Sequence, residues 1–397
     1  MKKSFLSVCI AGASVIGFAA TGHAQNAESL AEARAATQVV SDWVNGRLSD
    51  YKMPKITYSG APITLRFSTH TPATASSARL VEKPAFALLE KLTNGKIKVE
   101  QHHGGTIHKA REGLVALRNG LTDMAFCFTS YTPTLFNLTH GMSLPGLFPT
   151  EAVATQVGQE LASKYLVGEY KQHGVYLGYM RATTPYIYFS NDPIRKLEDI
   201  QHKKIRSSGG VHALVQKALG GVPTSVASPQ IYTAMQRGVV DMISLTDAVI
   251  KIFNLQEVTK YRTYVNVTRL NFERCISKRW YDALPADLQA VMNRFVAPMA
   301  QAESQILYRL AGAQAREIFK KAGMEFISVS AEEEARWQKA TSPLIEEFIA
   351  KNEAKGLPAR QFVDDMKALS KKYAGSSANE LTQRAIDNPA SAIAAHW

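Results

Sequence analysis

Cysteine is scarce in this sequence, with three in 397 residues. Cys9 lies in an N-terminal apolar run, which leaves Cys127 and Cys275 for the rest of the chain. Their spacing excludes a zinc module of paired cysteines. Cys127 lies in the apolar run 124–128, where a buried free thiol is the commoner outcome. In an exported chain a Cys127–Cys275 disulfide is the alternative.

Sequence patterns of enzymes are also missing. The chain has no Gly-x-Ser-x-Gly elbow, no His-Glu-x-x-His pair and no phosphate-binding Gly-Lys-Ser/Thr loop. His102, His103 and His108 form a cluster, but no further ligand is placed to complete a metal site, so we interpret it as a solvated loop. We expect no catalysis, no cofactor and no metal.

Long runs of one charge are absent, although the formal net charge is +12. Basic residues are scattered and lack an interleaved aromatic platform, which argues against nucleic acid as a partner. A basic protein that attracts small anions fits better, and most of these charges are ordinary surface. After the first twenty residues no apolar run is long enough to span a bilayer.

The N-terminus has the pattern of a cleaved secretory signal over residues 1–24. Lys2 and Lys3 precede an apolar run over 5–20, and small residues follow at 22–24. We therefore expect an exported, periplasmic protein. Residues 26–50 have apolar positions at helical spacing, which predicts an amphipathic helix that packs on the body. Contact with a receptor or with a second copy is the alternative.

Two stretches 118 positions apart are nearly the same. Residues 116–124 and 234–242 share Ala, Gly, Asp and Met at identical spacing. Each pattern predicts a helix that ends at the glycine, a short turn, an aspartate and an apolar strand. We interpret Asp123 and Asp241 as structural residues of these turns. The repetition predicts two similar α/β halves with a ligand cleft between them.

Strands and helices alternate along both halves. Strands are predicted over 63–67, 97–100, 124–128, 175–180, 186–189, 203–206, 221–226 and 239–245. Helices are predicted over 76–93 with a kink or restart at Pro84, 110–118, 152–173, 211–219 and 229–237. This order implies mainly parallel sheets with helices on both faces.

A long helical pattern over 287–321 is interrupted at Pro298. About 35 residues at 1.5 Å each would extend roughly 50 Å, so we expect this helix to span both halves with a kink at the proline. Residues 331–397 are predicted to be helical, and the polar end from 376 to be peripheral.

Arg206 is the strongest candidate for a ligand contact. It ends the predicted strand 203–206, and ligands of open α/β sheets bind beyond the carboxyl ends of strands. A guanidinium there can hold a carboxylate through two parallel hydrogen bonds. A surface salt bridge is the alternative.

Residues 203–206, 220–224 and 230–241 closely resemble the central segment of TRAP-transporter solute-binding proteins of the DctP type. The similarity extends over about residues 63–345, including the turns at 94–97 and 118–123 and the segment 281–288. The resemblance implies a periplasmic binding protein-like α/β fold of the class II type. Hinge strands and a long kinked helix would join its two domains, with the ligand cleft between them.

The same resemblance implies a function. Such a protein captures an organic acid by domain closure and delivers it to a sodium-driven TRAP membrane permease. Arg206 matches the arginine with which the family clamps the substrate carboxylate. We expect a signal peptide over 1–24 and a helical extension with its linker over 25–62. Domain I would comprise 63–183 plus 271–311, and domain II 184–270 plus 312–375. Residues 376–397 would form a C-terminal tail.

Departures from the family pattern bear on the substrate. Family members often have a second arginine at a position near Tyr186 in this chain. Arg181 is close to that position but offset, so whether it compensates for the missing arginine stays open. Sialic acid-binding members carry Gly-Gln-Glu-Asn where this chain has residues 242–245. The predicted ligand-binding residues are Arg206, His70, Phe128, Tyr186, Arg181, Leu245 and Asp247. A site so poor in polar groups predicts a monocarboxylate with an aromatic or branched apolar body. A receptor-docking sensor and an exported enzyme are the alternative functions.

Overall fold

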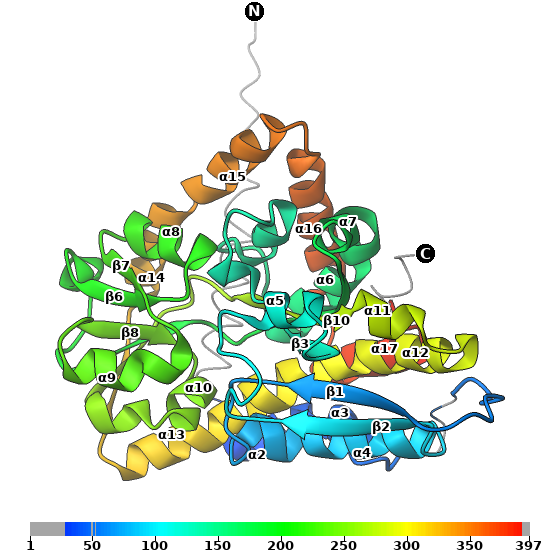
Figure 1. Ribbon diagram of the computed structural model, residues 1–397. Helices are drawn as coiled ribbons and strands as arrows, with labels where there is room; N and C mark the ends of the chain where they lie inside the picture. Colours follow the sequence, from blue (N-terminus) through cyan, green and yellow to red (C-terminus); the bar gives the residue numbers. More distant parts are fainter. Residues whose placement is uncertain (1–27, 49–50, 52, 391–397) are drawn as a thin grey trace, which may run out of the picture.

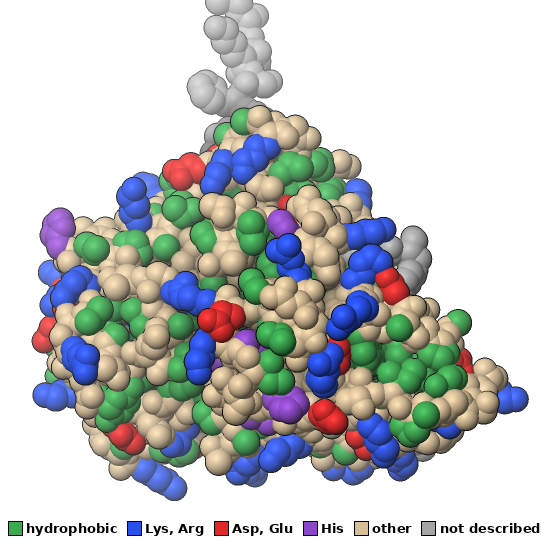
Figure 2. Space-filling view, viewed as in Figure 1, with side chains coloured by type: hydrophobic (Ala, Val, Ile, Leu, Met, Phe, Trp, Pro, Cys, Tyr) green, Lys and Arg blue, Asp and Glu red, His purple; other side chains and the backbone are tan. Residues whose placement is uncertain are grey.

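The structure, a computed structural model, describes residues 28–48, 51 and 53–390. The predicted signal peptide lies outside these residues. Two β-sheets with flanking helices form the body, and one long helix runs along both (Figure 1). In the part of the chain that the structure describes, no helix has the length and apolarity needed to cross a membrane. Lys and Arg side chains are spread over the face shown in Figure 2, with acidic residues among them.

The first sheet has the strand order β2-β1-β3-β10-β4. Its strands are β1 (Ile63–Ser68), β2 (Ile97–His102), β3 (Met124–Phe126), β4 (Val175–Ala182) and β10 (Asn271–Ser277). The second sheet has the order β11-β9-β5-β8-β6-β7. Its strands are β5 (Ile187–Ser190), β6 (Lys204–Ser207), β7 (Val222–Ser225), β8 (Met242–Leu245), β9 (Tyr261–Tyr264) and β11 (Glu325–Ser328).

Both sheets are mainly parallel, as expected, but each contains one strand that runs against both of its neighbours. β10 is antiparallel to β3 and β4, and β5 is antiparallel to β8 and β9. β5 follows β4 through residues 183–186, and β10 follows β9 through 265–270, without a helix in between. The expectation assumed that a helix returns each strand to its own sheet, whereas these two strands enter from the other sheet.

The helices between β1 and β10 flank the two sheets (Figure 1). They are the π-helix η1 (Ala78–Glu82), α4 (Lys83–Leu92), α5 (Gly113–Arg118), α6 (Glu151–Leu161), the π-helix η4 (Ala162–Leu166), α7 (Val167–Lys171), α8 (Gly210–Ala218), α9 (Ile231–Gln236) and α10 (Asp247–Ile252). Short 3-10 helices are η2 (Thr129–Tyr131), η3 (Leu138–Ser143), η5 (Leu197–Ile200), η6 (Ser228–Gln230) and η7 (Leu255–Val258). The restart predicted at Pro84 corresponds to the junction of η1 and α4.

The long helix runs through three segments after the short α11 (Lys278–Asp282). They are α12 (Ala286–Ala302), the π-helix η8 (Glu303–Leu310) and α13 (Ala311–Lys321). Pro298 lies inside α12 rather than at an interruption. Proline cannot donate to the carbonyl four residues earlier, and here the Tyr51 hydroxyl donates to that Arg294 carbonyl at 3.0 Å. The helix therefore continues past the proline and changes to π geometry only at Glu303.

The N-terminal extension forms two helices, α2 (Leu30–Ala36) and α3 (Gln38–Val44), that pack on the body. Val40, Trp43 and Val44 are buried in the apolar core beside the first sheet. Glu28 pairs with Arg309 of the long helix at 2.7 Å. The apolar face of this extension is thus covered by the protein's own core.

The C-terminal region is helical, as expected, but its end is packed. It consists of α14 (Ala331–Thr341), α15 (Pro343–Glu353), α16 (Ala359–Tyr373) and α17 (Ala378–Asp387). α17 contacts α12, α3 and α6, and buries Leu381 and Ile386. The expectation of a peripheral tail was based on the polar composition after 376, which does not show that the few apolar residues of α17 share one face. The predicted domain boundaries stay a prediction.

Cys127 and Cys275 form a disulfide, with their Cα atoms 5.8 Å apart. The expectation of a free buried thiol at Cys127 is therefore wrong, although both cysteines are buried. β10 lies beside β3 with Cys275 opposite Ala125, which brings the two cysteines together. No sequence pattern had predicted β10, so the proximity was not visible from the sequence.

Candidate functional site: the cleft between the sheets

The duplicated turns at 120–123 and 238–241 precede two inner strands that end at the cleft. Gly120 and Gly238 have φ of +70° and +66°, a backbone region that glycine enters without steric cost. Asp123 and Asp241 follow, each with its N–H donating 2.8 Å to the carbonyl of the neighbouring strand. The turns are therefore structural, as predicted from the sequence. β3 and β8 start there and end at the cleft.

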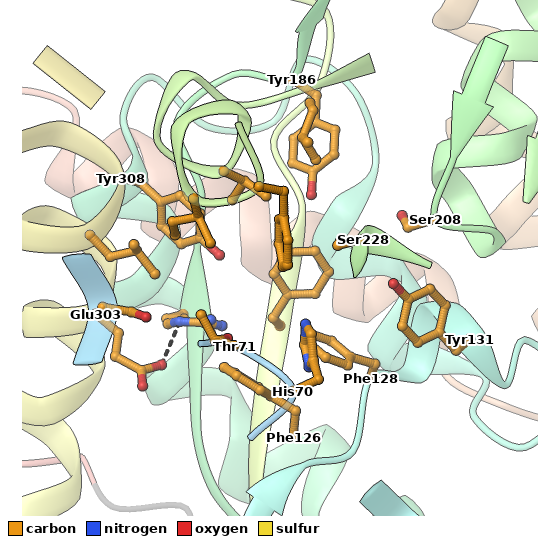
Figure 3. Close-up of a pocket in the computed structure, with 18 of the residues that line it drawn as sticks. His70, Thr71, Phe126, Phe128, Tyr131, Tyr186, Ser208, Ser228, Glu303 and Tyr308 are labelled. Carbon is orange, nitrogen blue, oxygen red and sulfur yellow. Dashed lines mark ion pairs between the residues drawn. The ribbon is translucent and has the colours of Figure 1, made fainter. Parts of the chain in front are cut away.

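A cavity at these strand ends contains about 620 Å³ free of protein atoms, part of it open to solvent (Figure 3). Six of the seven residues predicted to bind ligand line it, namely His70, Phe128, Arg181, Tyr186, Arg206 and Leu245. In Figure 3, Ser208 and Ser228 lie on one side of the cavity and Glu303 on the other. The first group belongs to the second half of the fold and Glu303 to the long helix.

Arg206 is 1% exposed and is the penultimate residue of β6, close to the strand end where the sequence had placed it. Its Nε donates to the Val226 carbonyl at 3.0 Å, and Nη1 to the Ser244 carbonyl at 3.4 Å. Nη2 donates to the Ser228 hydroxyl at 3.4 Å. Within the described part of the chain no acidic side chain pairs with Arg206. Only neutral acceptors meet this buried charge, which leaves it able to take an anion.

His212 on α8 supports this end of the cavity, and sequence reasoning missed it. Its Nδ1 is 3.1 Å from the Ser208 hydroxyl, and its Nε2 is 3.0 Å from the Ser244 hydroxyl. Burial and then the charge of Arg206 lower the pKa of His212 well below its ordinary value. The neutral ring stands edge-on to Tyr186, with centroids 4.8 Å apart. His212 therefore connects Ser208 with Ser244, whose carbonyl accepts from Arg206.

Aromatic rings form the cavity wall on the side of the first sheet. Phe128 stacks on Phe126 with centroids 4.5 Å apart, and meets Phe272 edge-on at 5.1 Å and Tyr131 at 5.3 Å. His70 meets Phe128 edge-on at 5.5 Å. Phe272 was missed because it belongs to β10. Such a wall provides faces and edges for an aromatic or other flat apolar group.

Burial, followed by the nearby charges of Arg274, His108 and Arg181, lowers the pKa of His70 to about 3. The ring is therefore neutral near pH 7. A neutral imidazole has one donor and one acceptor nitrogen, so His70 can bond a neutral polar group.

Arg181 lines the same cavity but already has an acidic partner. Its Nε lies 2.5 Å from a Glu303 carboxylate oxygen, and its guanidinium lies over the Phe126 ring at 4.6 Å. Arg274 also donates to Glu303 at 2.5 Å. Burial opposes ionisation, but the two arginines lower the pKa of Glu303 below its ordinary value. Glu303 is therefore an anion shared by two guanidinium groups.

Asp247 is the one predicted site residue that does not line the cavity. It begins α10, and its carboxylate accepts from Arg262 Nε at 2.6 Å and Nη2 at 2.8 Å. Arg316 of α13 adds a contact at 3.4 Å. Asp247 thus fixes α10, whose Val249 and Ile252 reach the cavity.

The histidine cluster is not the solvated loop that the sequence suggested. His108 is buried, with Nε2 2.8 Å from the Ser68 hydroxyl and Nδ1 2.9 Å from the Lys109 carbonyl. His103 lies 3.6 Å from Glu82. Among residues 28–48, 51 and 53–390 there is no group of three His, Cys, Asp or Glu side chains that could hold a metal.

The two sheets, with a cavity at their strand ends, define the fold class of a two-sheet solute-binding protein. Residues 67–352 match the family described as bacterial extracellular solute-binding protein, family 7 (DctP), and the chain belongs to this family. The C4-dicarboxylate-binding periplasmic protein DctP of Rhodobacter capsulatus is 28% identical over 294 residues, 72% of this chain and 86% of the relative. The predicted family is confirmed.

Solved structures show the same fold. A TRAP solute-binding protein from Rhodoferax ferrireducens T118, in complex with copurified benzoate, has a TM-score of 0.74 and 17% identity, over 79% of this chain and 98% of that one. A marine metagenome TRAP protein specific for aromatic acid ligands, bound to 3-hydroxybenzoate, has a TM-score of 0.73 and 22% identity, over 79% and 99%. The predicted fold class and the role as a solute-binding protein for TRAP transport are confirmed. The family is extracellular, while cleavage of a signal peptide stays a prediction.

Proposed function

We propose that this protein binds a monocarboxylate with an aromatic or branched apolar body and presents it to the membrane subunits of a TRAP transporter. The observation that carries the proposal is the buried Arg206 at the end of an aromatic cavity, which has neutral hydrogen-bond partners and, among the residues that the structure describes, no acidic one. A carboxylate there gains charge-assisted hydrogen bonds, and its apolar body is removed from water.

The cavity composition favours an aromatic body over a sugar. Its small neutral polar side chains are Thr71, Ser77, Ser208 and Ser228. A sugar acid has several hydroxyls, and each one buried without a partner costs about 1–3 kcal/mol. Similar solved structures hold aromatic acids in some proteins and galactonate or D-glucuronate in others, so the choice rests on the residues of this cavity.

Domain closure is the proposed mechanism of capture. Arg206 projects from the second sheet, and Phe128 from the end of β3 in the first. A ligand in contact with both would favour the closed arrangement over an open one. The connections over 183–186 and 265–270 and the long helix are the segments that would bend. Tyr186, His70 and Leu245 would enclose the apolar body, while Asp247 would hold α10 in place.

Calorimetric titration tests the proposal with benzoate, mandelate, galactonate and succinate. We expect the aromatic monocarboxylates to bind most tightly, and Arg206→Gln to weaken that binding by on the order of 100-fold. Arg237→Gln, on an exposed residue of the same half, is the matched control and should bind like the wild type. Unchanged affinity in folded Arg206→Gln, or binding confined to galactonate and succinate, would refute the proposal.

A further inference from the structure

Two buried arginines, Arg181 and Arg206, line the same cavity, and they differ in whether an acidic side chain pairs with them. Arg206 has none among the described residues, whereas Arg181 lies 2.5 Å from Glu303. We propose that Glu303 sets the charge specificity of the cleft: it neutralises Arg181, so the site accepts one carboxylate, at Arg206, and rejects a second. This inference rests on the proposed function and answers whether Arg181 replaces the second family arginine.

Glu303 is well placed for this role. It opens the π-helix η8, is 1% exposed and lies between Arg181 and Arg274, each 2.5 Å away. Arg274 also pairs with Glu82 at 3.3 Å. Burial raises the pKa of Glu82 to about 7. Burial also opposes ionisation of Glu303, but the two arginines outweigh it and lower the pKa of Glu303, so Glu303 is the anion that offsets the charge of Arg181.

The surroundings keep Arg181 with its partner. Its guanidinium lies over the rings of Phe126 at 4.6 Å, Tyr308 at 5.5 Å and Phe272 at 5.7 Å. These rings exclude water, which strengthens the ion pair and raises the cost of separating its charges. Release of Arg181 to a ligand would leave Glu303, among the described residues, with Arg274 as its remaining cationic partner.

A second ligand carboxylate at this end would also meet negative groups. Glu82 and Glu303 line the cavity there. A neutral polar substituent avoids this repulsion and can bond to the His70 ring. The cavity is therefore expected to discriminate between a neutral polar substituent and a second carboxylate by charge rather than by size.

A matched ligand pair makes the test independent of shape. 3-Nitrobenzoate and isophthalate have the same ring and nearly the same outline, but isophthalate has a second charge. Calorimetry on the wild-type protein should give a preference for 3-nitrobenzoate on the order of 100-fold. In Glu303→Gln, Arg181 loses its anion, and the preference should fall at least tenfold because isophthalate binds more tightly.

The double variant Arg181→Gln/Glu303→Gln is the control, because it removes both charges and should restore the wild-type preference. Folded Glu303→Gln with an unchanged preference overturns the proposal. If that variant fails to fold, the wild type decides: equal affinity for the two ligands overturns the proposal, and a strong preference for 3-nitrobenzoate upholds it. Failure of the proposed function itself would differ, because Arg206→Gln would then leave 3-nitrobenzoate binding intact.

Discussion

Asp123 binds Arg66 through both its backbone and its side chain. The Asp123 carboxylate accepts from the Arg66 N–H at 3.0 Å and from Arg66 Nε and Nη2 at 2.9 Å each. The Asp123 N–H donates to the Arg66 carbonyl at 2.8 Å. In the other half, Asp241 accepts from the Lys204 N–H at 2.8 Å and donates to its carbonyl at 2.8 Å. This repeated contact fixes each inner strand against its neighbour.

Loss of these contacts should destabilise the two halves unequally. Asp123 is buried and compensates the Arg66 guanidinium, whereas the Asp241 side chain is 35% exposed. We expect Asp123→Ala to lower the free energy of unfolding by about 3 kcal/mol and Asp241→Ala by about 1 kcal/mol. Urea unfolding followed by circular dichroism measures both. Equal losses would show that burial of the aspartate does not govern the contribution.

Removal of the disulfide should lower stability while leaving the strand pairing in place. Cys127 and Cys275 are 148 residues apart and close a long loop between β3 and β10. We expect Cys127→Ala/Cys275→Ala to lose about 2–5 kcal/mol. The measurement is urea unfolding with and without dithiothreitol. Reductant should shift the wild-type midpoint and leave the double variant unchanged, and a wild-type midpoint insensitive to full reduction would contradict this expectation.

Stability should depend on pH through Glu273. Burial raises the pKa of Glu273 from 4.5 to about 7, against the Thr129 hydrogen bonds and the charge of Arg181. The unfolded chain ionises this group more readily, so the folded state loses stability as pH rises from about 4.5 to about 7. Over that range the wild type should lose about 3 kcal/mol relative to Glu273→Gln. Urea unfolding of both proteins at pH 4.5, 6 and 8 measures the difference, and parallel pH curves would rule the effect out.

Tyr51 should stabilise the long helix because its hydroxyl donates to the Arg294 carbonyl, to which Pro298 cannot donate. The Arg294 carbonyl receives no helical N–H at that proline, and the Tyr51 hydroxyl is its partner. Tyr51→Phe should cost about 1 kcal/mol in the wild type. In a Pro298→Ala background an amide becomes available to this carbonyl, so the same change should cost less. A double-mutant cycle in urea measures the coupling, and strict additivity would argue against the assignment.

Several parts of the site could be predicted from the sequence because they depend on neighbours along the chain. Arg206 lies near the end of a short strand, and Asp123 comes after a helix-ending glycine, so both positions are set by local backbone geometry. The residues that complete the site depend on pairing across long separations. Phe272 reaches the cavity because β10 inserts between β3 and β4, and Glu303 meets Arg181 because the long helix crosses the first sheet.

The sequence by itself determined the duplicated helix-turn-strand unit, its turns, the position of Arg206 near a strand end and the family, because hydrophobic period, glycine and capping chemistry act within a few residues. Only the tertiary structure decided which charges are free. In the sequence Arg181, Arg206 and Asp247 are all candidates for a ligand contact, with Arg206 the strongest. Folding gives Arg181 and Asp247 partners from other segments and brings no acid of the described chain to Arg206, because a buried charge is compensated by whichever groups the fold brings within a few ångströms.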